Sequence, residues 1–324
     1  MKRIILLFIL TIAFQLSSWA QYLTSFEITD INNDVLTAKV QDNLGKLVSE
    51  INTACAEKRT PKLKGIDLSD RVSESIMMMW ESSPFRCEET EVIEPAFTDV
   101  SGWWQIRNIP FIFTDFEKDD QYHECIVSFD NNGKITGFHM AISQNLYRKV
   151  MKSGAAVKDA RRRQLILDYV EQFRTAYCTK DMPFLQQVCS EDALIITGHV
   201  VKVKPSRENN FISSTTKYSV QDKKTYLKKL AQVFRNNRTI RVTFDEIKVQ
   251  MHPTEADWYG VTLHQGYTAD GYHDDGWLFL LWDFTDEDNP TIHVRSWQAD
   301  TDPETQLKIS EDEIFGMDDV NIVK

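Results

Sequence analysis

The sequence predicts an α+β protein built from two tandem copies of one unit, each with helices followed by an antiparallel sheet. Three observations indicate this class: a helical stretch that recurs, a strand–turn–strand stretch that recurs in the same order, and a globular composition. Of the 324 residues, 42% are hydrophobic and 26% are charged, which is typical of a folded chain. A chain of this length suits about two domains of ordinary size.

The start of the chain is predicted to be a cleaved export signal. Two basic residues precede an apolar run over 4–16, and a small-x-small cleavage signal ends at Ala20. The run is shorter than the roughly 20 apolar residues that span a bilayer, although an uncleaved anchor is the alternative. No cysteine follows the cleavage point, so no lipid attachment is predicted. We expect a mature chain that begins at Gln21 and is periplasmic or secreted.

The recurring helical stretches are "LVSEINTACAEKR" (47–59) and "YVEQFRTAYCTKD" (169–181). Both place apolar residues at steps of three, four and seven, which forms one stripe on a helix. A second helix is predicted in each copy, over 72–81 and over 221–235. Each copy therefore starts with two helices.

The recurring strands follow these helices in both copies. "CIVSFDNNGKITGFHMAI" (125–142) aligns with "LLWDFTDEDNPTIHVRSW" (280–297), and at the same offset 91–95 aligns with 246–250. Both longer stretches predict strand, turn and strand, and "DNNGK" contains the Asn-Gly signal of a two-residue hairpin turn. Equivalent elements in the same order indicate an internal duplication.

These patterns divide the chain into five parts: a signal peptide (1–20), a degenerate first domain (21–145), a linker (146–160), a second domain (161–300) and an acidic tail (301–324). Helices followed by an antiparallel sheet form an α+β layer fold. The linker is basic and polar. The tail has one apolar cluster, "EIFGM", and we expect it to dock weakly or to stay mobile.

The charge and the missing motifs exclude several classes of partner. The net charge of −11 becomes more negative when the signal leaves, and such a charge repels phosphate backbones and anionic membranes. We expect no nucleic-acid partner, and no membrane after cleavage. HExxH, GxSxG and phosphate-binding glycine loops are missing, and the loop carboxylates lack the spacing of a calcium site. The sequence therefore predicts no cofactor and no metal.

The stretch "TAYCTKDMPFLQQVCSEDALIITG" (175–198) resembles the opening of the nuclear-transport-factor-2-like superfamily, which includes ketosteroid isomerases and polyketide cyclases. The matching features are Ala176, Asp181, Leu185, Asp192 and Ala193. The resemblance covers most of 161–300 and is weaker in the first copy. It implies two tandem cone-like domains, each with helices packed on a curved antiparallel sheet. It also implies pairing through the sheets, as an internal pseudo-dimer or as a homodimer.

The isomerase chemistry of that family is not expected here. The resemblance places the family's helix tyrosine at Phe173, its general base at Thr197 and its late aspartic acid at Leu280. Phenylalanine and leucine donate no hydrogen bond to an oxyanion, and threonine accepts no proton near neutral pH.

The strand "TIHVRSW" (291–297) raises the main question about a site. Alternation places His293, Arg295 and Trp297 on one face, and the resemblance implies that this face points into the cone. The corresponding residues of the first copy are Phe138, Met140 and Ile142. The first copy is thus predicted to be filled and apolar, and the second to be polar. Two alternatives remain: an outer face that meets water or a partner sheet, and a buried structural network.

The predicted pocket of the second copy has an aromatic body and one cationic end, which suits a small amphipathic anion. Its lining is predicted to be Phe173, Tyr177, Thr197, Trp282, His293, Arg295 and Trp297. Arg295 is the expected carboxylate ligand, because its planar fork binds a carboxylate through two hydrogen bonds. We expect an exported, non-catalytic small-molecule-binding or accessory protein. The alternatives are a cyclase-, isomerase- or hydrolase-type enzyme that uses His293 as acid or base, and a structural or protein-interaction module.

Overall fold

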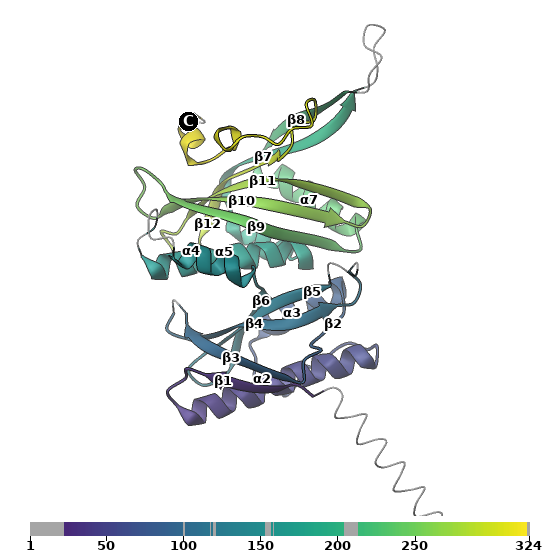
Figure 1. The fold of residues 1–324 in the computed structure, drawn as a ribbon, viewed down its shortest axis with the longest axis vertical. Coiled ribbons are helices and arrows are strands. Elements are labelled where there is room, and N and C mark those ends of the chain that lie inside the picture. The colour runs from purple at the N-terminus through teal and green to yellow at the C-terminus, as the bar shows by residue number, and fades with distance from the viewer. Residues whose placement is uncertain are drawn as a thin grey trace, which may run out of the picture. The chain divides into compact units, whose positions relative to one another are not determined.

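Two sheets, each with its own helices, organise the chain (Figure 1). The computed structural model describes residues 23–99, 101–116, 118, 121–152, 157, 159–203 and 213–322. The predicted signal peptide (1–20) and the start at Gln21 lie outside these residues. The chain divides into a first unit that ends at Ala141 and a second unit that begins at Ile142. No helix in the described ranges is long and apolar enough to cross a membrane.

The first unit begins with a short strand and two long helices. Its elements are β1 (Ser25–Thr29), α2 (Asp34–Ala56), α3 (Asp70–Ser82), β2 (Phe85–Arg86), β3 (Glu91–Thr98), β4 (Trp104–Phe113), β5 (Tyr122–Phe129) and β6 (Ile135–Met140). Asn33 and Ser69 begin the two helices, because their side chains accept hydrogen bonds from Leu36 N and Val72 N. The strand order is β1-β3-β4-β5-β6, and β2 pairs with β4.

The second unit repeats this plan with additional elements. These are α4 (Gln144–Lys152), α5 (Ala160–Thr179), α6 (Met182–Val188), β7 (Cys189–Val203), β8 (Ser213–Gln221), α7 (Lys223–Asn236), β9 (Ile240–Met251), β10 (Trp258–Ala269), β11 (Tyr272–Asp283) and β12 (Thr291–Ala299). The strand order is β8-β7-β12-β11-β10-β9. Asp181 caps α6, since its side chain accepts a hydrogen bond of 2.9 Å from Phe184 N. The Asp192–Ala193 step lies within β7.

The α+β class and the repeat of elements are confirmed. Both predicted helices of each copy are present, and four consecutive antiparallel strands follow in each unit, β3 to β6 and β9 to β12. The sheets are mixed, which differs from the prediction of purely antiparallel sheets. β1 runs parallel to β3, and β7 runs parallel to β12. Each parallel pair joins strands that are distant in sequence, which local hairpin signals do not reveal.

Two further expectations need correction, and docking, one of the two outcomes expected for the tail, is observed. The "DNNGK" turn is a longer loop, because Asp130 N bonds Lys134 O and the left-handed residue is Gly133, at φ 81°. The predicted linker, 146–160, contains most of α4 and the start of α5, and α4 packs on α5 and β9. The acidic tail, 301–324, holds two 3-10 turns, Glu311–Glu313 and Met317–Ile322, over the second sheet.

Candidate functional site

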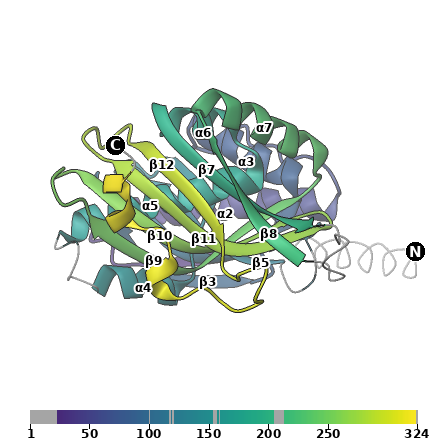
Figure 2. The same cartoon turned by 90° about the horizontal axis from the view of Figure 1, so that it is seen from above.

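The sheet of the second unit has two faces with different coverings. We call the face that carries Trp282 the inner face, and the face that carries Leu281 the outer face. Trp282 is fully buried against Tyr169 and Phe173 of α5, and α6 and α7 lie against β7. On the outer face, Phe279, Leu281 and Val294 pack against Met317 of the C-terminal segment. Figure 2 shows this segment, in yellow, over β10 and β11.

A β-bulge at His293 decides which residues of "TIHVRSW" face inward. In the pairing of β12 with β11, Ile292 lies opposite Trp282 and Val294 lies opposite Leu281, so His293 has no partner of its own. The pairing of β12 with β7 shifts at the same point. A bulge inserts one residue and thereby changes the alternation of faces along its strand. His293 therefore does not share a face with Arg295.

His293 lies on the outer face, which contradicts its predicted place in the pocket. Its ring stacks on the Trp258 indole, with ring centroids 4.4 Å apart. Its Nδ1 is 3.5 Å from Asp192 Oδ1, and its Nε2 is 3.7 Å from Asp283 Oδ2. The acid–base role suggested for His293 would need a position next to an inner-face ligand, and the bulge removes it from there.

Arg295 lies on the inner face as predicted, opposite Leu280 of β11. Only 8% of the residue is exposed. Its guanidinium lies over the Tyr226 ring, with Cζ 5.2 Å from the ring centroid. The buried Nε and Nη1 atoms make no hydrogen bond to any described residue. Arg295 is thus a buried cation with free donors.

Two tyrosines lie beside this guanidinium. Tyr177 of α5 and Tyr226 of α7 are both buried, and their hydroxyl groups are hydrogen-bonded to each other. Burial raises the pKa of Tyr226 well above its ordinary value, although Arg295 opposes this effect. Burial acts to lower the pKa of Arg295, but the neighbouring Tyr177 and Tyr226 outweigh it, and that pKa lies above its ordinary value. The guanidinium therefore keeps its charge in an apolar surrounding.

The aromatic and polar residues predicted around Arg295 share the inner face. Phe173 contacts Tyr177 at 5.0 Å and Trp282 at 6.4 Å between ring centroids. The Trp282 indole Nε1 is buried without a hydrogen bond among the described residues. Thr197 of β7 accepts a hydrogen bond of 2.8 Å from Gln221 Nε2.

Trp297 follows Arg295 by two residues on β12, beyond the bulge, and is buried. A Cβ at Gly276 would lie 2.7 Å from its indole, and a Cβ at Gly198 would lie 3.2 Å from it. The two glycines therefore provide the room for this side chain. The three positions at which the family's catalytic groups were expected, Phe173, Thr197 and Leu280, are all on the inner face.

Sequence reasoning missed Tyr226, Gln221 and two residues at the far end of the face, Tyr267 and Asp274. Tyr226 is one of three buried residues on α7, which made it look like ordinary core. Tyr267 and Asp274 lie opposite each other on β10 and β11. Residues along a strand alternate between faces, so Asp274 of β11 lies on the same face as Trp282, the inner face. This placement could have been predicted from the sequence.

The corresponding residues of the first unit are buried among phenylalanine rings, where a buried histidine, His123, also packs against Phe113 and Phe116. Phe138 is buried and packs at 6.0 Å from Phe85 and 5.7 Å from Phe111, between ring centroids. Met140 is fully buried at the end of β6. Ile142 is also buried, but it lies beyond β6 and begins the second unit.

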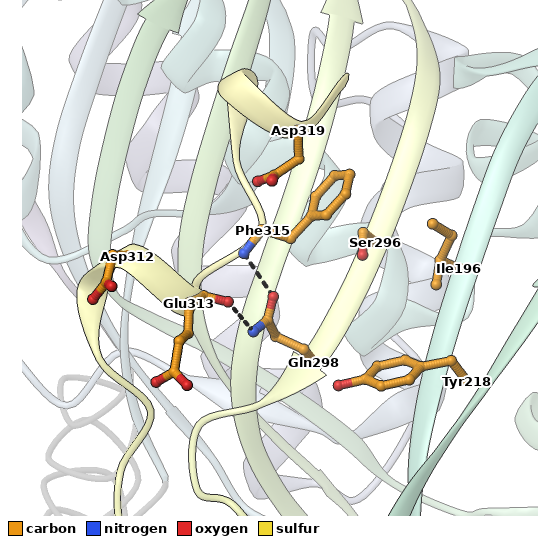
Figure 3. A pocket seen from close by; sticks show the side chains of 8 residues that line it. All are labelled: Ile196, Tyr218, Ser296, Gln298, Asp312, Glu313, Phe315 and Asp319. Atoms are coloured by element: carbon orange, nitrogen blue, oxygen red, sulfur yellow. Dashed lines mark hydrogen bonds between the residues drawn. The ribbon is translucent and has the colours of Figure 1, made fainter. Parts of the chain in front are cut away.

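A cavity of about 330 Å³ lies on the outer face of the second sheet, between β7, β8, β12 and the C-terminal segment (Figure 3). Its lining comprises Ile196, Tyr218, Ser296, Gln298, Asp312, Glu313, Phe315 and Asp319. Gln298 holds the segment in place, since its Nε2 donates to Glu313 O at 2.9 Å and its Oε1 accepts from Phe315 N at 2.7 Å. In the part of the chain that the structure describes, no group of three or more His, Cys, Asp or Glu is arranged to hold a metal.

Solved structures similar to this chain include NTF2-like and ketosteroid-isomerase-like proteins, as the sequence resemblance predicts. An NTF2-like protein from Cytophaga hutchinsonii is 15% identical, with a TM-score of 0.32; the match covers 42% of this chain and 97% of that protein. A putative ketosteroid isomerase from Shewanella frigidimarina is 11% identical, with a TM-score of 0.29, over 41% of this chain and 94% of that one.

Bd1075 of Bdellovibrio bacteriovorus is 16% identical, with a TM-score of 0.33. That match covers 44% of this chain and 43% of Bd1075, so this chain matches less than half of that protein. No protein-family model and no curated protein matches the chain. At these identities the similarity concerns the fold alone.

Proposed function

We propose that this chain is an exported, non-catalytic binding protein whose second unit holds a small amphipathic anion on its inner face. The observation that carries this proposal is the Arg295 guanidinium, which is nine-tenths buried with Nε and Nη1 unused by the described residues. Export rests on the predicted signal at 1–20.

A buried charge without a counter-charge is strongly unfavourable. The groups in direct contact with Arg295 are uncharged tyrosines, and the described carboxyl group that acts on it, Asp274, does so without a hydrogen bond or ion pair. A ligand carboxylate would supply a negative charge and accept a charge-assisted hydrogen bond from one of the two free donors, which lie on different edges of the guanidinium plane. Phe173 and Trp282 supply apolar surface for the rest of such a ligand.

Binding is a better account of this site than acid–base catalysis by His293. The bulge places His293 on the outer face, beside Trp258, away from the guanidinium. Phe173, Thr197 and Leu280 occupy the positions where the isomerase groups were expected, and these side chains do not transfer protons near neutral pH.

Calorimetry against a panel of small aromatic and aliphatic carboxylates tests the proposal. Arg295→Met keeps much of the side-chain volume and removes the charge. We expect it to weaken binding by about 10- to 150-fold, because a hydrogen bond to a charged group contributes about 1.5–3 kcal/mol.

The matched control is His293→Gln, which changes the same strand on its other face and should bind as wild type does. Circular dichroism of each variant checks that it is folded. The proposal fails if no carboxylate of the panel binds the wild type, or if Arg295→Met binds as tightly as the wild type.

A further inference from the structure

A second polar group with unused hydrogen-bonding capacity lies on the inner face, at the end opposite Arg295. Asp274 is half-buried on β11, directly across from Tyr267. Its Oδ2 accepts a hydrogen bond of 2.6 Å from the Tyr272 hydroxyl. Its Oδ1 is buried and accepts none from the described residues. A buried acceptor left unpaired is unfavourable, so a group that donates to Oδ1 would be stabilised there.

Tyr267 lies opposite Asp274 on the neighbouring strand. Burial raises the pKa of Tyr267, and its neighbours Tyr177 and Asp274 raise it further. Tyr177 is in turn hydrogen-bonded to Tyr226, over which the Arg295 guanidinium lies. Asp274 and Tyr267 therefore share the inner face with Arg295 and the two tyrosines beside it.

The pKa of Asp274 is raised above its ordinary value by its surroundings on this face. Burial is the main cause that raises its pKa, the Tyr272 hydrogen bond acts to lower it, and Arg295 is close enough to lower it as well. The neighbouring carboxylate, Asp275, points to the other face of the sheet, because successive strand residues alternate. Asp274 and Asp275 are thus adjacent carboxylates with opposite orientations.

We propose that the ligand of the second unit is a small acid with a hydrogen-bond donor at the end opposite its carboxylate. Arg295 binds the carboxylate and Asp274 Oδ1 accepts from the donor, which is a hydroxyl or an ammonium group. This inference rests on the proposed function, since it takes Arg295 as the site of the anion.

Matched acids that differ only in the donor test this inference. The first pair is 3-phenylpropionate and 3-(4-hydroxyphenyl)propionate, and the second, shorter pair is benzoate and 4-hydroxybenzoate. For the pair whose length fits, we expect the hydroxylated acid to bind the full-length protein about tenfold more tightly, which corresponds to one hydrogen bond to a charged group. A third acid, 3-[4-(aminomethyl)phenyl]propionate, shows whether an ammonium group is preferred to a hydroxyl.

Two variants test whether Asp274 causes the preference for the hydroxylated acid. Asp274→Ala should remove the preference for the hydroxylated acid, whereas Asp275→Ala should retain it. If hydroxylated and plain acids bind equally, or if the preference survives in Asp274→Ala, the inference is overturned while binding at Arg295 stands. If none of these acids binds the wild type, the proposed function fails, and the inference fails with it.

Discussion

At the scale of single residues, small side chains determine whether the large inner-face side chains can be accommodated. A Cβ at Gly276 would lie 2.4 Å from the backbone oxygen of Gln298 and 2.7 Å from the Trp297 indole. Real Cβ atoms do not approach neighbours so closely, so a larger residue at this position would force the indole or the strand to move. Arg295 lies two residues before Trp297 on the same strand.

Gly276→Ala is therefore expected to lower the free energy of unfolding by about 1–3 kcal/mol, the usual cost of overpacking a well-packed region. Urea denaturation with an unchanged m-value measures the effect. Gly271→Ala is the control, because nothing lies within 4 Å of a Cβ at Gly271. Equal stability of Gly276→Ala and the control would show that neither Gln298 O nor Trp297 restricts this position.

At the scale of elements, local signals predicted helices and hairpins well, and non-local pairing poorly. Most of the stretches 47–59 and 169–181 lies in α2 and α5, which end at Ala56 and Thr179, because helix periodicity is a property of neighbouring residues. The parallel partners of β1 and β7 come from distant parts of the chain, so no local pattern indicated them.

The candidate site was predictable to the same extent. Arg295, Phe173 and Trp282 were placed on the inner face correctly, since strand and helix periodicity sufficed. His293 was placed wrongly, because strict alternation takes no account of a bulge. Tyr226 was missed, because only the packing of α7 against β7 brings it to Arg295.

The C-terminal segment is the other element whose behaviour the sequence underestimated. Met317 is buried in a cluster with Phe279, Leu281 and Val294 on the outer face. Met317→Asp would place an unpaired charge in that cluster. We expect limited proteolysis after residue 300 to become at least about tenfold faster, because burial of a methionine contributes about 1.5–3 kcal/mol. The control is Asp318→Asn, which changes the exposed neighbouring residue and should be cleaved at the wild-type rate. Equal cleavage rates for Met317→Asp and the wild type would contradict the docking of the segment.

At the scale of the whole molecule, the two units share a plan and differ in their interiors. The first interior is filled by phenylalanine rings, such as Phe85, Phe111 and Phe138. The second carries a guanidinium, tyrosines and a carboxyl group among its apolar residues. Each unit has a sheet of its own, so we expect the proposed binding role to need the second unit alone.

A chain of residues 142–324 is therefore expected to fold and to bind the same carboxylates with the affinity of the full protein. Calorimetry with one acid on both proteins makes the comparison. The shorter chain keeps Ile142, whose backbone N–H donates to Glu171 Oε1 at 2.8 Å. A folded but non-binding product would show that the first unit contributes to the site.

The bulge at His293 has a consequence for how this protein can change over time. With His293 left out, Ile292 would be followed directly by Val294 and Arg295, and the order inner, outer, inner would be unbroken. His293 is thus an inserted residue, and the residues on either side of it would alternate correctly between the two faces without it. Substitutions of His293 change the outer face beside Trp258 and Asp283. They leave Arg295 on the inner face unchanged. The exterior and the interior of this strand are free to evolve separately.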